Sequence, residues 1–553
     1  MANMLSIGIS GLQASQRNLT TTGHNISNVN TDGFSRQSVE LATRNPLSSG
    51  NGFIGSGVDI TTVKRVYDQF LSDQVTTHTS SFNQLDTLQQ LASGVDGLLA
   101  NQDAGLNPAL QNFFNALQDA ANNPTSIPAR QVVISEAENL VNRFSSLDAR
   151  FEDLRSSIND QLGAVTTQIN AIASSIAGLN SSITLEMAKA GGQPPNDLLD
   201  KRDVLINQLA ELVSVSTVDG NDGSVNIFIG NGQNLVLGNT ATTIGTMRNT
   251  FDKSQFDVSL GSGATEYSIS SQITGGKLGG LLAFRDEVIN PAQDSMGRIA
   301  IGLAATFNTQ HQLGDDINGN PGGLFFNSIV ASSPEVLASS NNNPVSGTVG
   351  VSITDTNLIK ASEYRLNYDG ATFSLQRLSD NTIVDSGFTI ADFPRTVASD
   401  GITLTLAGSA AAGDSFLIRP VRNGSSDIDV AIGSASEFAA AASGNSLGDN
   451  SNALTLVDMQ LKNVLGGSTE TYQSAYAKLV ASVGGTTNKA KVNANAQSVL
   501  LNRAVEEQQS VSGVNLDEEA ANLVKFQQAY QASAQIVRIA NEVFQTLLNA
   551  TSR

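Results

Sequence analysis

The chain has 553 residues, which suggests three or four domains at about 150 residues each. Its 51 acidic and 31 basic side chains give a formal net charge of −20, which disfavours binding to nucleic acid or to an anionic membrane surface. The absence of cysteine excludes disulfides, thiol catalysis and thiolate metal sites.

The composition also bounds the core and the route of export. Apolar residues make up 40% and aromatic residues 5%, so the core must be mainly aliphatic. No apolar run reaches the ~18–20 residues that cross a bilayer, and no basic segment followed by an apolar one opens the chain. We therefore expect no membrane insertion and no cleaved secretory signal.

A heptad pattern opens the chain. Apolar residues recur every seven positions, and small residues follow the first three of them by three positions. The apolar set is Leu5, Leu12, Leu19 and Ile26, and the small set is Gly8, Ser15 and Thr22. This spacing predicts one helix stripe that another helix can approach closely. The turn-forming residues 28–33 end the pattern.

Helical and extended segments then alternate. An extended stretch is predicted at 58–66, helical spacing at 71–98, and a loop at 122–124. The longest apolar periodicity runs over 140–183, with a stutter near Ile158, and predicts a coiled-coil-like helix roughly 65 Å long. A further helix is predicted at 196–213, β texture from 214, and another helix over 280–312.

Residues 330–420 read as a separate β module. The stretch YRLNYDGATFSLQRL predicts a hairpin that turns at Asp369-Gly370. GITLTLAG and DSFLIRP predict two more strands. Helix signals return near Asn452.

A second heptad closes the chain, after Asn515 as a predicted N-cap. Its stripe is Leu523, Phe526, Tyr530, Ser533, Val537, Ala540, Phe544 and Leu547. Helices at both ends with β modules between them predict that the termini pair and that the inner layers are insertions. We expect an α+β multidomain fold with a terminal coiled-coil domain (1–60 plus 505–553), a mainly helical middle domain with β elements (61–329 plus 421–504) and an outer β domain (330–420).

No chemical motif has the context that it needs. The G-x-G-x-x-G match at 50–55 is not placed between a strand and a helix, so a loop is expected there. The segment Asp316–Asn320 starts like a calcium loop, but Pro321 and Asn327 replace the required Gly and Glu, so a turn is expected. The three histidines, His24, His78 and His311, have no metal-site spacing. We predict no catalytic, cofactor or metal residues.

Residues 4–37, MLSIGISGLQASQRNLTTTGHNISNVNTDGFSRQ, resemble the N-terminal signature of bacterial flagellar rod, hook and hook-associated proteins. That signature is an amphipathic helix followed by an Asn-rich turn of the form Asn-x-x-Asn-x-x-Thr-x-Gly-aromatic. Here the turn is filled by Asn25, Asn28, Thr31, Gly33 and Phe34. Asp32 stands where Pro is frequent, and we expect the turn to be a hinge at the end of the first helix.

Other stretches look like the family of hook-associated protein 1, the hook–filament junction protein. They are GSGVDITTVKRVYDQFL (55–71), NDLLDKRDVLINQLAELV (196–213), GGKLGGLLAFRDEVI (275–289), GDNSNALTLVDMQ (448–460) and GVNLDEEAANLVKFQQAYQASAQIVRIANEVFQTLL (513–548). The module at 330–420 resembles no domain that we can place.

The resemblance implies a structural subunit of the extracellular flagellum, assembled as a ring of copies between hook and filament. It implies contacts with the hook protein and with a second junction protein. It further implies secretion through the flagellar type III export apparatus without a cleaved signal, and a dedicated chaperone that holds the C-terminal helix. The terminal helices would form an inner coiled-coil layer, and no cofactor is implied.

We therefore expect the terminal stripes to make the assembly contacts. The N-terminal residues are Leu5, Leu12, Leu19 and Ile26, and the C-terminal residues, which the chaperone would also bind, are Leu523, Phe526, Tyr530, Val537, Phe544 and Leu547. One alternative is an extracellular adhesin or surface-layer protein, suggested by the acidic Gly/Ser/Asn-rich β regions. The other is a junction protein with an enzymatic insert at 330–420, where the acids to consider are Asp369, Asp380 and Asp385.

Overall fold

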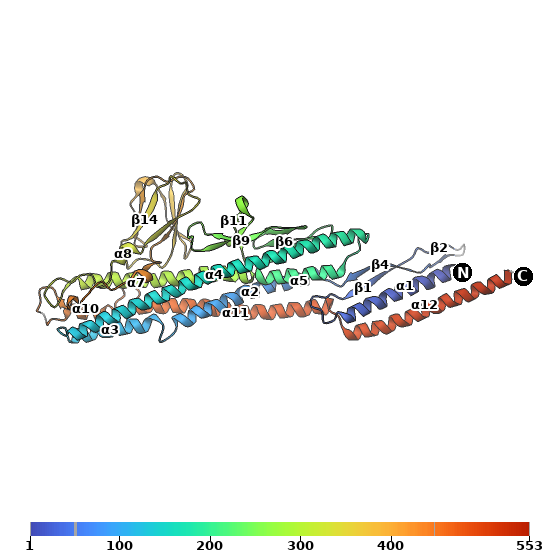
Figure 1. Ribbon diagram of the computed structural model, residues 1–553, viewed down its shortest axis with the longest axis horizontal. Helices are drawn as coiled ribbons and strands as arrows, with labels where there is room; N and C mark the ends of the chain where they lie inside the picture. Colours follow the sequence, from blue (N-terminus) through green and yellow to red (C-terminus); the bar gives the residue numbers. More distant parts are fainter. Residues whose placement is uncertain (1, 49–51, 447, 552–553) are drawn as a thin grey trace.

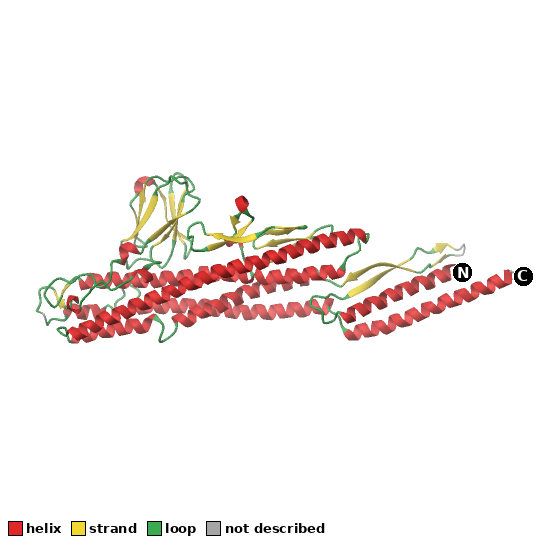
Figure 2. Ribbon diagram, in the orientation of Figure 1, coloured by secondary structure: helices red, strands yellow, loops and turns green. Residues whose placement is uncertain are grey.

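The computed structural model describes residues 2–48, 52–446 and 448–551. The protein is an elongated rod whose two termini lie at the same end (Figure 1). Long helices run along the rod. Most of the strands project from one side of the rod, in the part away from the two termini (Figure 2). The α+β multidomain architecture expected from the sequence is confirmed.

The body of the rod is a bundle of helices from two distant parts of the chain. Its helices are α2 (Gln69–Leu99), α3 (Leu106–Asn122), α4 (Ile127–Lys189), α5 (Asn196–Leu212), α6 (Gly276–Phe284), α7 (Asn290–His311), α10 (Ser451–Asp458) and α11 (Tyr472–Ser512). α11 packs along α2, which also contacts α5 and α6. The Tyr476 hydroxyl of α11 donates a 2.7 Å hydrogen bond to the carbonyl of Leu99, at the end of α2. The late segment therefore completes a bundle that the early segment begins.

Two of the predicted helices differ in detail from the structure. The long helix α4 has 63 residues and extends beyond both ends of the predicted 140–183. Ser126 caps its start, because its hydroxyl accepts a hydrogen bond from the Ala129 amide. The run predicted at 280–312 is α6 and α7 joined by a π-helical turn at Arg285–Ile289, which periodicity alone does not reveal.

The apolar stripe of α4 forms the spine of the core. Its side chains Phe144, Phe151, Leu162, Ile169 and Ile176 are fully buried. By length and composition alone, one stretch of α4 is apolar enough to cross a membrane. This stripe nevertheless packs inside the protein, as in a core helix.

Two small sheets lie against α4. One has the order β5 (Val215–Asp219), β6 (Val225–Ile229), β7 (Gln233–Leu237), β8 (Thr240–Ala241), and the other has the order β11 (Tyr267–Ser268), β10 (Phe256–Leu260), β9 (Ile244–Arg248). Asn170 of α4 donates to the Ile244 carbonyl (2.7 Å) and accepts from its amide (2.9 Å). Asn180 does the same at Val225, at 2.8 and 3.2 Å. Each carboxamide thus substitutes for a neighbouring strand at the start of β9 or β6.

The segment Glu335–Arg419 forms the outer β structure. A five-stranded antiparallel sheet has the order β13 (Glu335–Ala338), β20 (Ser415–Arg419), β15 (Tyr364–Tyr368), β16 (Phe373–Arg377), β17 (Thr382–Phe388). A second sheet has the order β14 (Thr348–Ile353), β19 (Ile402–Ala407), β18 (Arg395–Val397). The predicted hairpin at Asp369-Gly370 is β15–β16, and β19 and β20 are the two other predicted strands.

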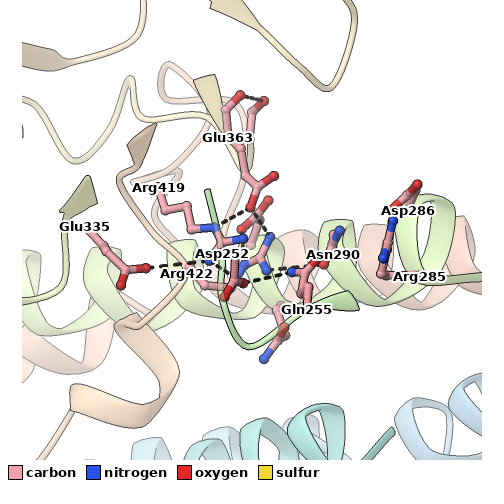
Figure 3. A network of polar contacts seen from close by, with 12 residues as sticks. Asp252, Gln255, Arg285, Asp286, Asn290, Glu335, Glu363, Arg419 and Arg422 are labelled. Atoms are coloured by element: carbon pink, nitrogen blue, oxygen red, sulfur yellow. Dashed lines mark hydrogen bonds and ion pairs between the residues drawn. The ribbon is translucent and has the colours of Figure 1, made fainter. Parts of the chain in front are cut away.

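A buried ion cluster joins this β structure to the body (Figure 3). Arg419 pairs with Asp252 at 2.9 Å and with Glu363 at 2.6 Å. Arg422 pairs with the same Glu363 at 2.9 Å and with Asp294 of α7 at 2.7 Å. Burial acts to raise the pKa of Glu363, but the two guanidinium groups outweigh it and hold the pKa below its usual range. Because each buried charge has a partner, the cluster fixes the β structure on the helices.

The remaining short elements close the body. They are β12 (Gly314–Asp315), α8 (Ile329–Ser332), α9 (Gly424–Asp427) and β21 (Ala441–Ala442). The Asp316 carboxylate accepts hydrogen bonds from the amides of Asn318 (2.7 Å) and Asn320 (2.9 Å). The calcium-like segment is therefore the Asx turn that the sequence predicted.

The terminal layer consists of α1 (Ala2–Ser27), α12 (Leu516–Thr551) and a β arm. The arm is the antiparallel pair β1 (Gln37–Thr43) and β4 (Val58–Arg65), extended by β2 (Leu47–Ser48) and β3 (Phe53–Ile54). Of the G-x-G-x-x-G match, Gly50 and Asn51 lie outside the described residues, and Phe53–Ile54 is a strand where a loop was expected. α1 and α12 pack along each other, as the two terminal heptads predicted.

Candidate assembly interface

Glycines allow α1 and α12 to approach closely. A Cβ on Gly8 would lie 2.8 Å from Val537 Cγ2, and a Cβ on Gly11 would lie 2.7 Å from Ser533 Oγ. The contacts run in opposite directions along the two helices, so α1 and α12 form an antiparallel hairpin (Figure 1). We call α1 and α12 the terminal hairpin. The heptad pattern singled out Gly8 but not Gly11, which is not part of the predicted stripe of α1.

The N-terminal stripe is only partly buried in this hairpin. Leu5, Leu12, Leu19 and Ile26 are all half-buried. The buried residues of α1 are instead small or polar, among them Gly8, Ala14, Ser15 and Thr22, while Ser10 is buried against the β arm, where it accepts from the Val58 amide (3.2 Å). Such small side chains bury little apolar area, so much of the apolar surface of α1 stays accessible.

The C-terminal stripe is more exposed still. Tyr530 is 40% exposed, Phe544 52% and Leu547 49%. Leu523 is 37% exposed, while Phe526 and Val537 are half-buried. Further apolar side chains of α12 are open to solvent: Val524, Ile539, Val543 and Leu548. Large apolar residues in this number on one exposed helix mark an interaction surface.

The Asn-rich turn is built on one buried amide. Asn25 is 1% exposed, donates to the Gln37 carbonyl and accepts from the Gln37 amide, both at 2.9 Å. It therefore ties the end of α1 to the start of the β arm. Asn28 closes the next turn, because its side chain donates to the His24 carbonyl (3.0 Å) and accepts from the Thr31 hydroxyl (3.2 Å).

The rest of the motif seats the turn on the body. Gly33 has φ +73°, and a Cβ there would lie 2.1 Å from Val204 Cγ2 of α5. Phe34 stacks edge-on against the His24 ring, with centroids 5.4 Å apart. The structure thus brings all five motif residues, Asn25, Asn28, Thr31, Gly33 and Phe34, into one compact turn. The positive φ of Gly33 is a backbone conformation that glycine adopts without the steric cost of a Cβ.

Sequence reasoning missed the partners of this turn. They are carboxylates at the start of α5, Asp197, Asp200 and Asp203, together with Arg65 of β4. Their spacing of three along the helix was the available signal, since it places them on one face. Burial raises the pKa of the Asp203 carboxyl, against the opposing charge of Arg65.

The residues weighed for chemistry have structural contacts. His311 is fully buried, accepts from the Ala439 amide (2.9 Å) and lies 2.8 Å from the Gly323 carbonyl, and burial lowers its pKa. In the outer β structure, Asp369 binds the Thr372 amide, Asp380 pairs with Arg377, and Asp385 pairs with Arg395. Among the described residues no three His, Asp or Glu side chains gather as a metal site.

Comparison with known protein families first defines the class. Residues 5–34 match the model of the flagella basal body rod protein, and residues 507–550 match that of the flagellar basal body rod FlgEFG protein C-terminal region. The first segment is α1 with its turn, and the second is the end of α11, the connecting residues 513–515 and α12. The terminal hairpin is therefore of the kind found in flagellar axial proteins.

The body and the outer β structure define the family. Residues 92–326 match the helical domain of flagellar hook-associated protein FlgK, and residues 337–420 match the D2-like domain of flagellar hook-associated protein 1. The chain is 35% identical to flagellar hook-associated protein 1 of Salmonella typhimurium, over 99% of this chain and 100% of that protein, and 34% identical to the Escherichia coli K12 protein, again over 99% and 100%. The flagellar hook junction protein FlgK of Burkholderia pseudomallei has the same fold, with a TM-score of 0.73 and 27% identity over 80% of this chain and 100% of that one.

The chain belongs to the flagellar hook-associated protein 1 family, whose members are structural components of the flagellum. The resemblance seen in the sequence is confirmed, and it now includes the module at 337–420 that the sequence left unplaced.

Proposed function

We propose that the chain is a structural subunit of the junction between flagellar hook and filament, and that copies of it assemble into a ring through the terminal hairpin. The ring contacts the hook protein on one side and a second junction protein on the other. The observation that carries this proposal is the exposed apolar stripe of α12, described above. Burying it against neighbouring copies would stabilise the assembly by roughly 25 cal/mol per Å² of apolar area, before the ordering of side chains is subtracted.

The proposed mechanism is packing, with no enzymatic step. The residues that make the contacts are Leu5, Leu12, Leu19 and Ile26 of α1 and Leu523, Phe526, Tyr530, Val537, Phe544 and Leu547 of α12. The acids of the outer β structure are engaged in turns and ion pairs, which supports a structural role for the insert. The adhesin alternative has no support in the family relationship, since the matched relatives are flagellar proteins.

The route to the site of assembly is part of the proposal. The chain is exported through the flagellar type III apparatus without a cleaved signal and reaches an extracellular position at the hook tip. Before export, a dedicated chaperone covers the α12 stripe. Covering it is physically reasonable, because an exposed apolar helix invites association before the subunit arrives.

The test replaces the aromatic residues of α12 and compares them with polar neighbours on the same helix. The triple variant Phe526→Ala, Tyr530→Ala, Phe544→Ala is expressed in a strain that lacks its own junction protein. The control variant changes the exposed Gln528, Gln531 and Gln545 to Ala. We expect filaments on hooks with the control and not with the aromatic variant, counted by electron microscopy. Immunogold labelling should place the wild-type chain at the hook tip; labelling over the whole cell surface would contradict the proposal.

A further inference from the structure

The start of α5, with the sequence NDLLDKRD (196–203), has no role in the proposal above. Three of its carboxylates, Asp197, Asp200 and Asp203, are spaced by three residues and so lie along one side of the helix. We call these three residues the aspartate ridge. Its partners all belong to the terminal layer or to the turn that leads into it.

The first member of the ridge holds α1 and β1. Asp197 Oδ1 accepts a 2.8 Å hydrogen bond from the Gln37 side chain and lies 3.3 Å from His24 Nε2. The backbone carbonyl and amide of Gln37 also form the two hydrogen bonds to the Asn25 side chain. Neighbouring Asn196 adds a 2.8 Å hydrogen bond to the Val63 carbonyl of β4. One end of α5 thus touches the helix end and both strands of the arm.

The other two members hold the turn and β4, and they are less exposed. Asp200 accepts from the Ser35 amide at 3.1 Å and from the Arg65 guanidinium at 3.0 Å. The same Arg65 nitrogen lies 2.5 Å from Asp203. The side chains of Arg65 and Asp200 are only 12% and 6% exposed. An ion pair shielded to this extent is screened less by solvent than an exposed one.

Another charged residue of this segment, Arg202, fixes α5 to the body. Arg202 donates to the Asn180 side chain of α4 (3.1 Å) and to the Gly223 carbonyl (2.7 Å). Asn180 is the residue that clasps the start of β6. The ridge is therefore mounted on a helix that is itself tied to α4 and to the segment before β6.

An open cleft lies beside the ridge. Its volume is about 940 Å³, and it is lined by residues 29–36 of the turn, by residues 508–515 at the end of α11 and beyond it, and by residues of α2 and α5, including Asp203 and Asn207. Beside this cleft the turn packs on the body at Gly33 and Val204, and the Arg36 amide donates a 2.8 Å hydrogen bond to the Ser512 carbonyl of α11. The ridge supplies the buried ion pairs of this junction.

We propose that the aspartate ridge is the seat that fixes the orientation of the terminal layer relative to the body. It holds the end of α1, the turn and the β arm at one defined angle, while α12 is connected through the short hinge at Gly513–Asn515. This inference concerns the isolated chain and does not rest on ring formation.

The experiment measures the angle directly. Since the chain has no cysteine, Arg17→Cys on α1 and Glu211→Cys on α5, both at exposed positions, give two unique sites for spin labels. Double electron–electron resonance on the full-length chain should give one narrow distance distribution. In the double variant Asp200→Ala, Asp203→Ala the distance distribution should broaden about twofold, and the Ser35 amide proton should exchange about tenfold faster with solvent. Circular dichroism verifies that the body remains folded.

Two further variants keep the test decisive. Lys201→Gln changes an exposed charge on the same helix and should leave the distribution narrow. The triple variant Arg65→Met, Asp200→Asn, Asp203→Asn removes the Arg65 charge together with its two carboxylate partners, so it separates loss of the seat from damage by a stranded Arg65. It too should give a broad distribution. A narrow distribution in the triple variant, or a broad one in the wild type, would overturn the inference.

Discussion

The long helix α4 of the body and the terminal helix α12 carry the same kind of apolar heptad, but their surroundings differ. Phe151 and Leu162 of α4 are fully buried, because α3, α5 and two sheets cover the stripe. Phe544 and Leu547 of α12 are about half exposed, and the glycines of α1 contact α12 at Ser533 and Val537, not at these residues. The body completes its core within one chain, and the terminal hairpin does not.

This difference separates two uses of one sequence pattern. In α4 the heptad stabilises the fold of the single chain. In α12 much of it stays exposed in the single chain. The number of covering elements, and not the heptad itself, distinguishes the two cases.

Deleting Leu516–Arg553 should have the largest effect of the changes considered. It should abolish assembly and leave the body folded. The body does not depend on α12 for its core, so its helical signal and its thermal midpoint should stay close to those of the full chain. Filament attachment should be lost entirely. Circular dichroism on the purified fragment and filament counts in a complemented strain measure the two effects. A truncated chain that still supported filaments would remove α12 from the assembly interface.

Matched aromatic truncations compare the two heptads directly. Phe151→Ala opens a cavity in a fully buried site and should lower the free energy of unfolding by about 3–5 kcal/mol. Phe544→Ala removes a side chain that is 52% exposed and should change it by less than about 0.5 kcal/mol. Urea denaturation of both variants provides the measurement. Equal losses would mean that α12 is covered within the free chain.

The turn between the hairpin and the body offers a finer comparison. Gly33→Val combines a positive φ with a clash against Val204, so it should lower the local opening free energy of residues 35–37 by about 2 kcal/mol or more. Hydrogen exchange of those amides reports the change. Asp32→Pro should be tolerated in assembly, because Asp32 is exposed and its amide donates no backbone hydrogen bond within the described residues. The opposite ranking of the two variants would contradict the turn geometry.

Lowering the pH should have the smallest effect. It acts on the ion cluster that joins the outer β structure to the body. Burial opposes ionisation of Asp252, but the Arg419 charge and hydrogen bonds from Ser254 outweigh it and lower its pKa from 3.8 to about 2. A carboxyl whose pKa is lower in the folded state stabilises the fold above its ordinary pKa, and this stabilisation is lost as the pH falls through the folded value. It amounts to about 2 kcal/mol.

Comparison with Asp252→Asn isolates this contribution. Asp294 acts in the opposite sense, because burial raises its pKa, but it does so equally in both proteins. The difference in unfolding free energy between wild type and variant should therefore shrink as the pH falls from about 4 to about 2. A difference that stays constant over this range would show that Asp252 is not held ionised by Arg419.

The elements that could be predicted are those with a repeating pattern. The heptads of α1, α4 and α12 predicted three helices, and Asp369-Gly370 predicted a hairpin, because local spacing and turn chemistry determine them. The pairing of α1 with α12 followed from their places at the two ends of the chain. The π turn at Arg285–Ile289 left no periodic signal, since its residues continue the helical spacing.

The contacts between parts could not be predicted in this way. Asn170 and Asn180 each clasp the start of a strand, and nothing in their local sequence separates them from solvent-facing asparagines. Asn25 stood out as part of the turn motif, but the motif did not predict its hydrogen bonds to Gln37. Arg419 and Glu363 meet across 56 residues, and Arg65 and Asp203 across 138. A single sequence shows how far apart two residues are along the chain. No shared spacing or motif links the members of these pairs, so their contacts could not be predicted.

By itself the sequence determined most of the long helices, the strands β15, β16, β19 and β20 of the outer module, the meeting of the two ends and the family. It did so because hydrophobic period, turn residues and the terminal signature are local properties of the chain. Only the tertiary structure decided which heptad is buried and which is left open. Burial depends on how many elements cover a stripe, and that number is set by the packing of segments hundreds of residues apart.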